Sequence, residues 1–243
     1  MQRRWTTSEI RALAFKRVLK PLWLRRKEFA PGAVDSPLGL LPIKPDLVLK
    51  EFLALKLEEP YEIIPELDRD PLASSQIGGI LDRELNLVVV AKSLTLESRR
   101  YTILHEAGHY VLHPEFVYHR DVPLIGSERT ELRGRPREEV EADIFAAEVL
   151  MPKRLVIDLF FARYGGAVSP DEIDEDLVFK LSLGIGRRLS IDVLLFGTGR
   201  ANARRERSRI FAIDTHAGVS FTQLFLVSRE AMAIRLEELG LVL

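Results

Sequence analysis

The pattern that most constrains this chain is His105-Glu106-Ala107-Gly108-His109, because it works only if one helix presents both imidazoles together. Residues four apart on an α-helix lie about 6 Å apart along the axis and about 40° apart around it. The two histidines therefore project from one face and can share a metal ion. Glu106 leaves the same turn, where its carboxylate can act as a general base, as in zinc-dependent hydrolytic sites.

Local signals place this pattern inside a helix rather than in a loop. Thr95 can cap a helix, and Glu97 lies in its first turn, where the helix dipole favours a negative charge. Pro114 ends the helix, and the residues between carry one apolar stripe, which consists of Leu104, Ala107, Gly108, Val111 and Leu112. The alternative is an incidental match, but two histidines on a buried helix face need hydrogen-bond partners. We therefore predict a metal site.

A third protein ligand is needed, because catalytic zinc takes three and keeps the fourth position for water. The extended pattern that would supply a third histidine fails, since Leu112 stands in place of glycine and Glu115 in place of histidine. His113 is expected to be a helix-end residue, because three ligands in a row on one rigid helix cannot surround one ion. His119 is a weak candidate, since it lies in the polar stretch 114–136, which we expect to be a long loop.

The better candidate for the third ligand lies on a second helix, predicted from Pro136 to Met151. The spacing of Glu139 and Asp143 puts two carboxylates on one helix face. Glu139 can complete the metal shell, and Asp143 can accept the free N–H of a ligating imidazole. Glu141 is expected to be solvated on another face. The competing interpretation is that these acidic residues form an ordinary first turn favoured by the helix dipole. The upstream histidines favour Glu139 as a metal ligand.

The remaining patterns predict a small mixed sheet and a mainly helical C-terminal part. Strands are predicted at 61–64, 77–81 and 85–91, the last two joined as a hairpin by Asp82-Arg83-Glu84. Further elements are a helix between the Thr6-x-x-Glu9 capping box and Pro21, helices at 46–57, after Ser169-Pro170, at 190–196, after Ser220 and at 229–239, and a strand at 210–213. The fold class is therefore α+β.

A shift in composition at Gly165-Gly166 suggests a boundary between two domains. We expect a zincin-like metallopeptidase domain at 1–165, with a small mixed sheet and the helices of the site. A mainly helical domain at 166–243 would follow, with a helix-turn-helix-like end, and would regulate the first domain or dock its substrate.

Composition excludes several function classes. With 35 basic and 36 acidic residues, the net charge of −1 excludes a globally basic DNA-coating protein, although 199–209 holds five arginines. The absence of cysteine excludes disulfides and thiolate metal sites and fits a reducing cytosol. No apolar stretch approaches the roughly 18 residues of a membrane span, and no apolar region follows the basic N-terminus. We expect a cytoplasmic protein without membrane contact.

Three segments in this order resemble the ImmA/IrrE family of metallopeptidases: 99–113, 139–152 and the closing helical segment 227–240. The resemblance implies a gluzincin-like peptidase core. In that core His105, His109 and Glu139 would bind Zn²⁺, with Mn²⁺ or another divalent ion as alternatives, and Glu106 would be the catalytic base. Asp143 stands where the family often has Asn, and it keeps the hydrogen-bond acceptor.

The resemblance also implies cytosolic and highly selective proteolysis. Characterised members cleave helix-turn-helix repressors of the Xre/Cro type and so release genes for a DNA-damage response or for mobile-element transfer. We therefore expect a zinc-dependent, site-specific endopeptidase whose partner is a protein substrate, a transcriptional repressor, in a stress or mobile-element response. The sequence carries no signal for the oligomeric state.

Two functions from other classes use the same features. One is a DNA-binding or sensor regulator with a catalytically silent metallopeptidase fold. The arginines of 199–209 and the helix-turn-helix-like end favour this alternative. The other is a small-molecule metallohydrolase with the same ligands. Direct DNA binding is not expected, because the last helix carries the apolar residues of a packing helix and recognition helices expose polar groups. The arginine-rich stretch could instead dock the protein target or an anionic signal.

Two further features bear on catalysis. An oxyanion donor is expected, and Tyr118, His119 and His216 are unranked candidates for it. The strand at 85–91 could pair with an extended substrate if it lies at an exposed sheet edge, although its apolar character argues partly against that position.

Overall fold

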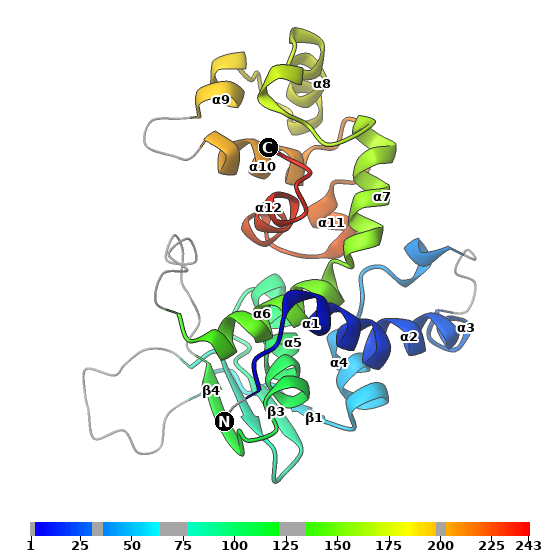
Figure 1. Ribbon diagram of the computed structural model, residues 1–243, viewed down its shortest axis with the longest axis vertical. Coiled ribbons are helices and arrows are strands. Elements are labelled where there is room, and N and C mark those ends of the chain that lie inside the picture. Colours follow the sequence, from blue (N-terminus) through cyan, green and yellow to red (C-terminus); the bar gives the residue numbers. More distant parts are fainter. Residues whose placement is uncertain (1–2, 31–35, 64–76, 122–134, 198–202) are drawn as a thin grey trace. The chain divides into compact units, whose positions relative to one another are not determined.

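The computed structural model of the protein describes residues 3–30, 36–63, 77–121, 135–197 and 203–243 (Figure 1). The chain divides into two compact units, residues 1–149 and residues 150–243. The N-terminal unit combines helices with a four-stranded sheet, and the described part of the C-terminal unit is built from helices. This architecture confirms the α+β class.

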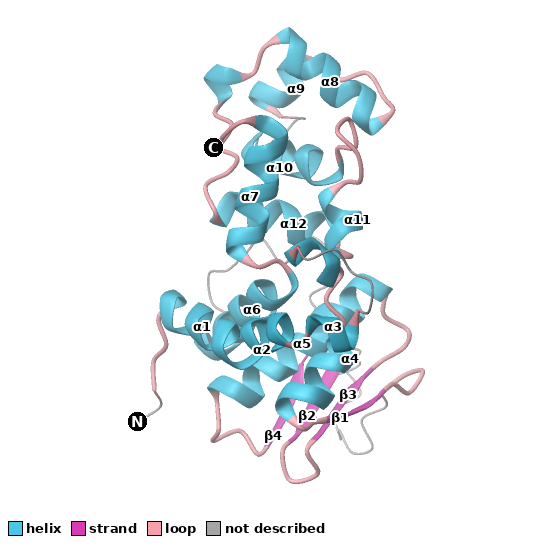
Figure 2. Ribbon diagram, turned by 90° about the vertical axis from the view of Figure 1, so that its right-hand side faces the viewer, coloured by secondary structure: helices cyan, strands magenta, loops and turns pink. Residues whose placement is uncertain are grey.

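The sheet of the N-terminal unit has the strand order β1-β3-β2-β4 (Figure 2). Its strands are β1 (Lys56–Glu58), β2 (Gly79–Asp82), β3 (Leu87–Val90) and β4 (Tyr118–Asp121). β1 runs parallel to β3, whereas β2 is antiparallel to both β3 and β4. The predicted hairpin of β2 and β3 is confirmed, with Asn86 in the turn at a φ of +51°.

Several strand predictions are wrong. β3 pairs with strands on both sides, so it is not the exposed edge that substrate pairing would need. Residues 61–63 form no strand, and Ile64 lies outside the described residues. β4 forms inside the stretch 114–136 that was expected to be a loop. β1 overlaps the end of the helix predicted at 46–57. The observed helical segment ends at Ala54, whose φ of +55° turns the chain into the strand.

The first helical segment continues past Pro21, where we predicted its end. It comprises α1 (Thr7–Ala14), a π-helical turn (Phe15–Leu19), α2 (Lys20–Leu24) and α3 (Arg26–Phe29). The wide turn closes with the Lys20 N–H donating to the Phe15 carbonyl. Pro21 then lies at the first turn of α2, where proline is tolerated.

Two long helices support the candidate site. α5 (Leu96–Leu112) packs against β2 and β3, and the Thr95 side chain caps it as predicted, by accepting the Ser98 N–H at 3.2 Å. α6 (Arg137–Leu150) confirms the second predicted helix. The two helices lie very close together, since a Cβ added to Gly108 would lie 3.0 Å from the Ala142 Cα. A larger residue at 108 would push α6 away from α5.

Arg83, in the β2–β3 turn, holds the C-terminal end of α5 in place. Its guanidinium donates to the carbonyls of His109, Tyr110 and His113 at 3.3, 2.9 and 3.1 Å, and also to that of Phe116 at 3.0 Å. The last carbonyls of a helix have no partner inside the helix, so one half-buried arginine satisfies several of them. It thereby links the hairpin turn to the helix that carries both histidines.

The C-terminal unit is a group of helices around an aromatic core. Its helices are α7 (Lys153–Tyr164), α8 (Glu175–Ile185), α9 (Ile191–Phe196), α10 (Ala203–Ile213), α11 (Phe221–Phe225) and α12 (Arg229–Glu238). The Phe160 ring of α7 lies 5.8 Å from that of Phe211 and 6.0 Å from that of Phe221. The division into units therefore precedes α7, whereas we expected a boundary at 165. Gly165 is the left-handed residue that ends α7.

The described part of the arginine-rich stretch and the residues 210–213, predicted as a strand, together form α10. Arg205 and Arg209 make ion pairs with Glu230 of α12 at 2.6 and 2.7 Å, and Arg205 also pairs with Glu237 at 2.7 Å. Arg207 is buried and donates to the Leu194 carbonyl at 2.8 Å. These guanidinium groups hold helices together within the unit.

Candidate metal centre

The described residues contain one group of metal-ligating side chains whose donor atoms converge, and it is the predicted one. One ligand atom each of His105, His109 and Glu139 lies within 4.8 Å of the others. The His105 Nε2 lies 3.0 Å from the His109 Nε2 and 3.2 Å from a Glu139 oxygen. The His109 Nε2 lies 3.4 Å from the other Glu139 oxygen. Ligand atoms in a tetrahedral site with bonds of about 2.0–2.1 Å lie about 3.3 Å apart, so these spacings fit a divalent ion.

The environment of the two imidazoles also suits a cation. His105 and His109 are almost fully buried. Burial lowers the pKa of His109 to about 2, with the neighbouring imidazoles acting in the same direction, so its ring is neutral and has a lone pair to offer. Burial alone would raise the pKa of Glu139, but hydrogen bonds from His105 and His119 hold it well below its usual range. The neutral imidazole of His109 and the carboxylate of Glu139 are electron-rich groups, and their convergence with the His105 ring fits a positive ion between them.

Asp143 lies where the sequence predicts it, one turn after Glu139. One of its oxygens is 2.9 Å from the His105 Nδ1. A carboxylate can only accept, so His105 donates from Nδ1 and turns Nε2 toward the other ligands. The guanidinium of Arg135 contacts the second Asp143 oxygen and lies 3.6 Å from a Glu139 oxygen. The carboxylates of Asp143 and Glu139 thus each contact the His105 ring and the Arg135 guanidinium.

Glu106 is fully buried at the foot of the site. Its carboxylate lies 3.4 Å from the His119 Nδ1 and faces β2, since a Cβ on Gly79 would lie 2.8 Å from the Glu106 Oε1. Glycine at position 79 therefore leaves the space that the carboxylate occupies. The residue after the first histidine is placed beside the ligands, as the helix geometry predicts.

His119, a weak ligand candidate and one of the three oxyanion candidates, contacts the site from a strand that was expected to be a loop. From β4 its Nε2 donates to a Glu139 oxygen at 2.9 Å, and its ring stacks on that of His109 with 3.8 Å between centroids. Burial acts to lower its pKa, but the carboxylates of Glu106 and Glu139 outweigh it and raise the pKa of His119 to about 9. The aromatic and β-branched run Phe116-Val117-Tyr118 was the strand signal that could have placed it.

The other two oxyanion candidates differ in position. The side chain of Tyr118 lies outside the described part of the structure. His216 belongs to the C-terminal unit, where its ring is hydrogen-bonded to the buried carboxylate of Asp214.

Glu141 is a residue whose surroundings we predicted wrongly, and it contacts His113. Glu141 is 4% exposed rather than solvated, and His113 is 1% exposed. The His113 Nε2 lies 3.1 Å from a Glu141 oxygen, and its Nδ1 lies 3.0 Å from the Nδ1 of His109. His113 is the residue that ends α5, as expected, and it is not among the converging ligands.

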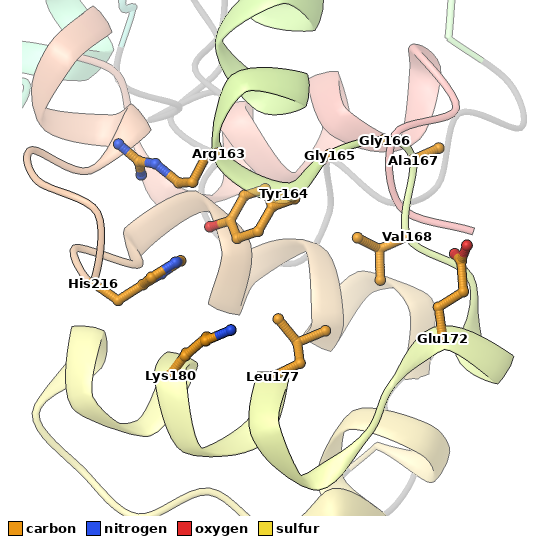
Figure 3. A pocket seen from close by; sticks show the side chains of 10 residues that line it. All are labelled: Arg163, Tyr164, Gly165, Gly166, Ala167, Val168, Glu172, Leu177, Lys180 and His216. Atoms are coloured by element: carbon orange, nitrogen blue, oxygen red, sulfur yellow. The ribbon is translucent and has the colours of Figure 1, made fainter.

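A second concave site lies in the C-terminal unit, with a volume of about 430 Å³ (Figure 3). The nitrogen atoms of Arg163, Lys180 and His216 gather at one end and the carboxylate of Glu172 lies at the other. Each of these side chains already has a partner. Arg163 donates to the backbone carbonyls of Asp214 and Val219, and Lys180 pairs with the carboxylate of Asp176. The His216 ring is hydrogen-bonded to the carboxylate of Asp214, and the Glu172 carboxylate accepts the backbone N–H of Ser169. This pocket lacks the convergence that marks the metal centre.

A helix that presents two histidines and a glutamate beside a second helix that supplies a carboxylate defines the zincin class of metallopeptidase sites. Residues 69–175 match the model of the Peptidase_M78 family, described as the IrrE N-terminal-like domain. The match spans β2 to α7 and includes every residue of the metal centre. It confirms the resemblance to the ImmA/IrrE metallopeptidases. A metallopeptidase family implies a divalent metal.

Two further findings complete the comparison. No curated protein matches the chain. Among the described helices, none has both the length and the apolar composition that crossing a membrane requires.

Proposed function

We propose that the protein is a cytoplasmic, zinc-dependent, site-specific endopeptidase that cleaves a helix-turn-helix transcriptional repressor of the Xre/Cro type. The observation that carries this proposal is the convergence of His105, His109 and Glu139, with the buried carboxylate of Glu106 linked to Glu139 through the ring of His119. Two imidazoles and one carboxylate are a common ligand set of catalytic zinc, although Mn²⁺ or another divalent ion would also fit such ligands. The family match supports the peptidase part of the proposal.

The residues present divide the reaction between them. When bound, the ion would supply a Lewis acid that makes water easier to deprotonate and the scissile carbonyl easier to attack. Glu106 accepts the proton of the attacking water and passes it to the departing amine. His105, His109 and Glu139 hold the ion, and Asp143 orients the His105 ring through Nδ1.

His119 is the oxyanion donor in this proposal. Of the two candidates whose side chains the structure describes, it is the one that lies against both Glu106 and Glu139. Its raised pKa supplies N–H donors at neutral pH, and a donor aimed at the developing charge is worth about 3–4 kcal/mol in comparable sites.

The repressor as substrate rests on the resemblance of 99–113, 139–152 and 227–240 to the ImmA/IrrE family. A DNA-binding regulator with a silent peptidase fold has less support. The guanidinium groups of Arg205 and Arg209 are paired with glutamates of α12 rather than turned outward. In α12 itself, Met232 and Leu236 are buried in the unit.

Replacing Gly79 by alanine should lower the peptidase rate about 10²-fold while metal affinity stays within a few-fold of wild type. The added Cβ would lie 2.8 Å from the Glu106 Oε1 and 2.6 Å from the Thr102 Cγ2, so the carboxylate must move, and misplacement by about 1 Å can cost that factor. Steady-state kinetics and metal competition measure the two effects. Gly166→Ala is the control, because its Cβ meets no atom within 4 Å. A wild-type rate for Gly79→Ala would contradict the placement of the base.

The proposed function is tested by co-expressing the protein with a helix-turn-helix repressor from the same genome, beginning with one encoded beside its gene if there is one. A cleavage product should form with the wild-type protein and be absent with Glu106→Gln, and mass spectrometry of the fragments would locate the bond. The same repressor should be cleaved by the purified protein with Zn²⁺ and stay intact with a chelator. An intact repressor under all these conditions would contradict the substrate class. Salt-sensitive binding of the protein to DNA would instead favour the regulator.

A further inference from the structure

We infer that Glu141 and His113 are positioning residues that fix the tautomer of His109, so that its Nε2 lone pair faces the metal centre. The inference rests on the proposed metal site and goes beyond it, because neither residue is a ligand or touches the substrate carbonyl. It concerns a chain of three hydrogen-bonded groups that runs from the buried face of α6 to the second ligand of α5.

The chain is continuous and buried. The Glu141 Oε2 lies 3.1 Å from the His113 Nε2, and the His113 Nδ1 lies 3.0 Å from the His109 Nδ1. None of the three side chains is more than 5% exposed. Water therefore does not compete for these hydrogen bonds, and each ring nitrogen must be satisfied by its neighbour.

The groups at the two ends of the chain set the direction of its bonds. A carboxylate accepts only, so the His113 Nε2 carries the proton and donates to Glu141. The His109 Nε2 is the atom that converges with the other proposed ligands and needs its lone pair there, so the His109 proton lies on Nδ1 and is donated to the Nδ1 of His113. The Nε2 of His109 is left with its lone pair, and this is the atom that lies 3.4 Å from Glu139 and 3.0 Å from the His105 Nε2.

The other oxygen of Glu141 fixes the orientation of the carboxylate. The Glu141 Oε1 accepts the backbone N–H of Trp5 at 3.2 Å and the Nε–H of Arg137 at 2.6 Å. Trp5 is anchored in turn, because its indole N–H donates to the Leu112 carbonyl at 3.0 Å and its own carbonyl accepts from Arg137 at 2.8 Å. Two donors therefore occupy one oxygen and leave the other for His113.

The two imidazole ligands are thus oriented by different means. His105 has a carboxylate directly on its Nδ1, that of Asp143. His109 lies deeper, and His113 relays the effect of Glu141 to it. Partners of this kind typically contribute 10- to 100-fold to metal affinity or activity.

The test compares Glu141→Gln with Glu141→Met. In the glutamine variant the amide oxygen must face Trp5 and Arg137, which both donate, so its NH₂ faces His113. That reverses every bond of the chain and places a proton on the His109 Nε2. Methionine has a similar length but imposes no direction. We expect Zn²⁺ affinity to fall about 10- to 100-fold in Glu141→Gln and by a smaller factor in Glu141→Met.

Affinity is measured by competition with a chromogenic chelator, and ¹⁵N NMR of the imidazoles in the metal-free protein reads the tautomers directly. The His109 proton should move from Nδ1 to Nε2 in Glu141→Gln. Glu148→Gln is the matched control, because Glu148 is a buried glutamate of α6 that pairs with Arg11 at 3.4 Å and lies outside the chain. Its Zn²⁺ affinity should equal that of wild type.

A role in packing alone predicts the opposite order, since glutamine has the shape of glutamate and methionine removes three hydrogen bonds. The inference would be overturned, while the metal site stands, if Glu141→Met bound Zn²⁺ more weakly than Glu141→Gln. An unchanged His109 tautomer in Glu141→Gln would overturn it as well. A wild-type protein that binds no divalent ion would overturn the inference and the proposed function together.

Discussion

Replacing Glu139 by alanine is expected to weaken Zn²⁺ binding by about 10²- to 10³-fold and to abolish peptidase activity at micromolar metal. Structural zinc sites with four ligands contribute about 10–16 kcal/mol, or about 2.5–4 kcal/mol for each ligand. Glu139 is the ligand that α6 supplies, and without it both remaining imidazoles come from one face of α5. Equilibrium competition with a chelator measures the affinity, and elemental analysis of the purified protein measures the metal content.

Glu138→Ala is the control for this change, because Glu138 precedes Glu139 on the same helix turn and is not among the converging ligands. Its metal affinity should match that of wild type. Equal affinities for Glu139→Ala and wild type would show that the ion, if bound, takes its third ligand elsewhere.

Replacing Glu106 by glutamine is expected to lower kcat by about 10²- to 10⁴-fold, the usual contribution of a general base, with Zn²⁺ still bound. Glutamine keeps the size of the buried side chain but cannot accept a proton from water. Glu106 is not one of the converging ligand atoms, so the three that hold the ion are unchanged. Kinetics with a cleavable repressor or peptide, alongside metal analysis of the same sample, separates catalysis from binding.

Glu97→Gln serves as the control variant for kcat. Glu97 lies in the first turn of the same helix, before the turns that carry the histidines. A rate for Glu106→Gln close to that of wild type would remove Glu106 from the reaction. Loss of metal together with activity would make it a ligand or a structural support instead.

The part of the site that the sequence predicts rests on signals local to one helix. Thr95 and Pro114 bound α5, the spacing of His105 and His109 puts both rings on one face, and the helical spacing of Glu139 and Asp143 does the same on α6. These patterns need only the geometry of a single helix, so they are read directly from the chain.

The other part depends on contacts between distant segments. His119 reaches the site because β4 pairs with β2, and Glu141 is buried because Trp5 covers it from 136 residues away. Nothing near either residue in the chain signals these neighbours. The short apolar run at 210–213 fits a strand or a helix equally well by periodicity, and packing against α12 decides for the helix.

The position of Trp5 has a practical consequence for anyone who produces this protein. Its backbone N–H donates to Glu141 and its indole N–H to the Leu112 carbonyl, so residues that precede α1 contribute to the surroundings of the candidate metal centre. A preparation that has lost the residues up to Trp5 would lack one of the donors that orient Glu141, so intact mass should be checked before metal affinities are compared.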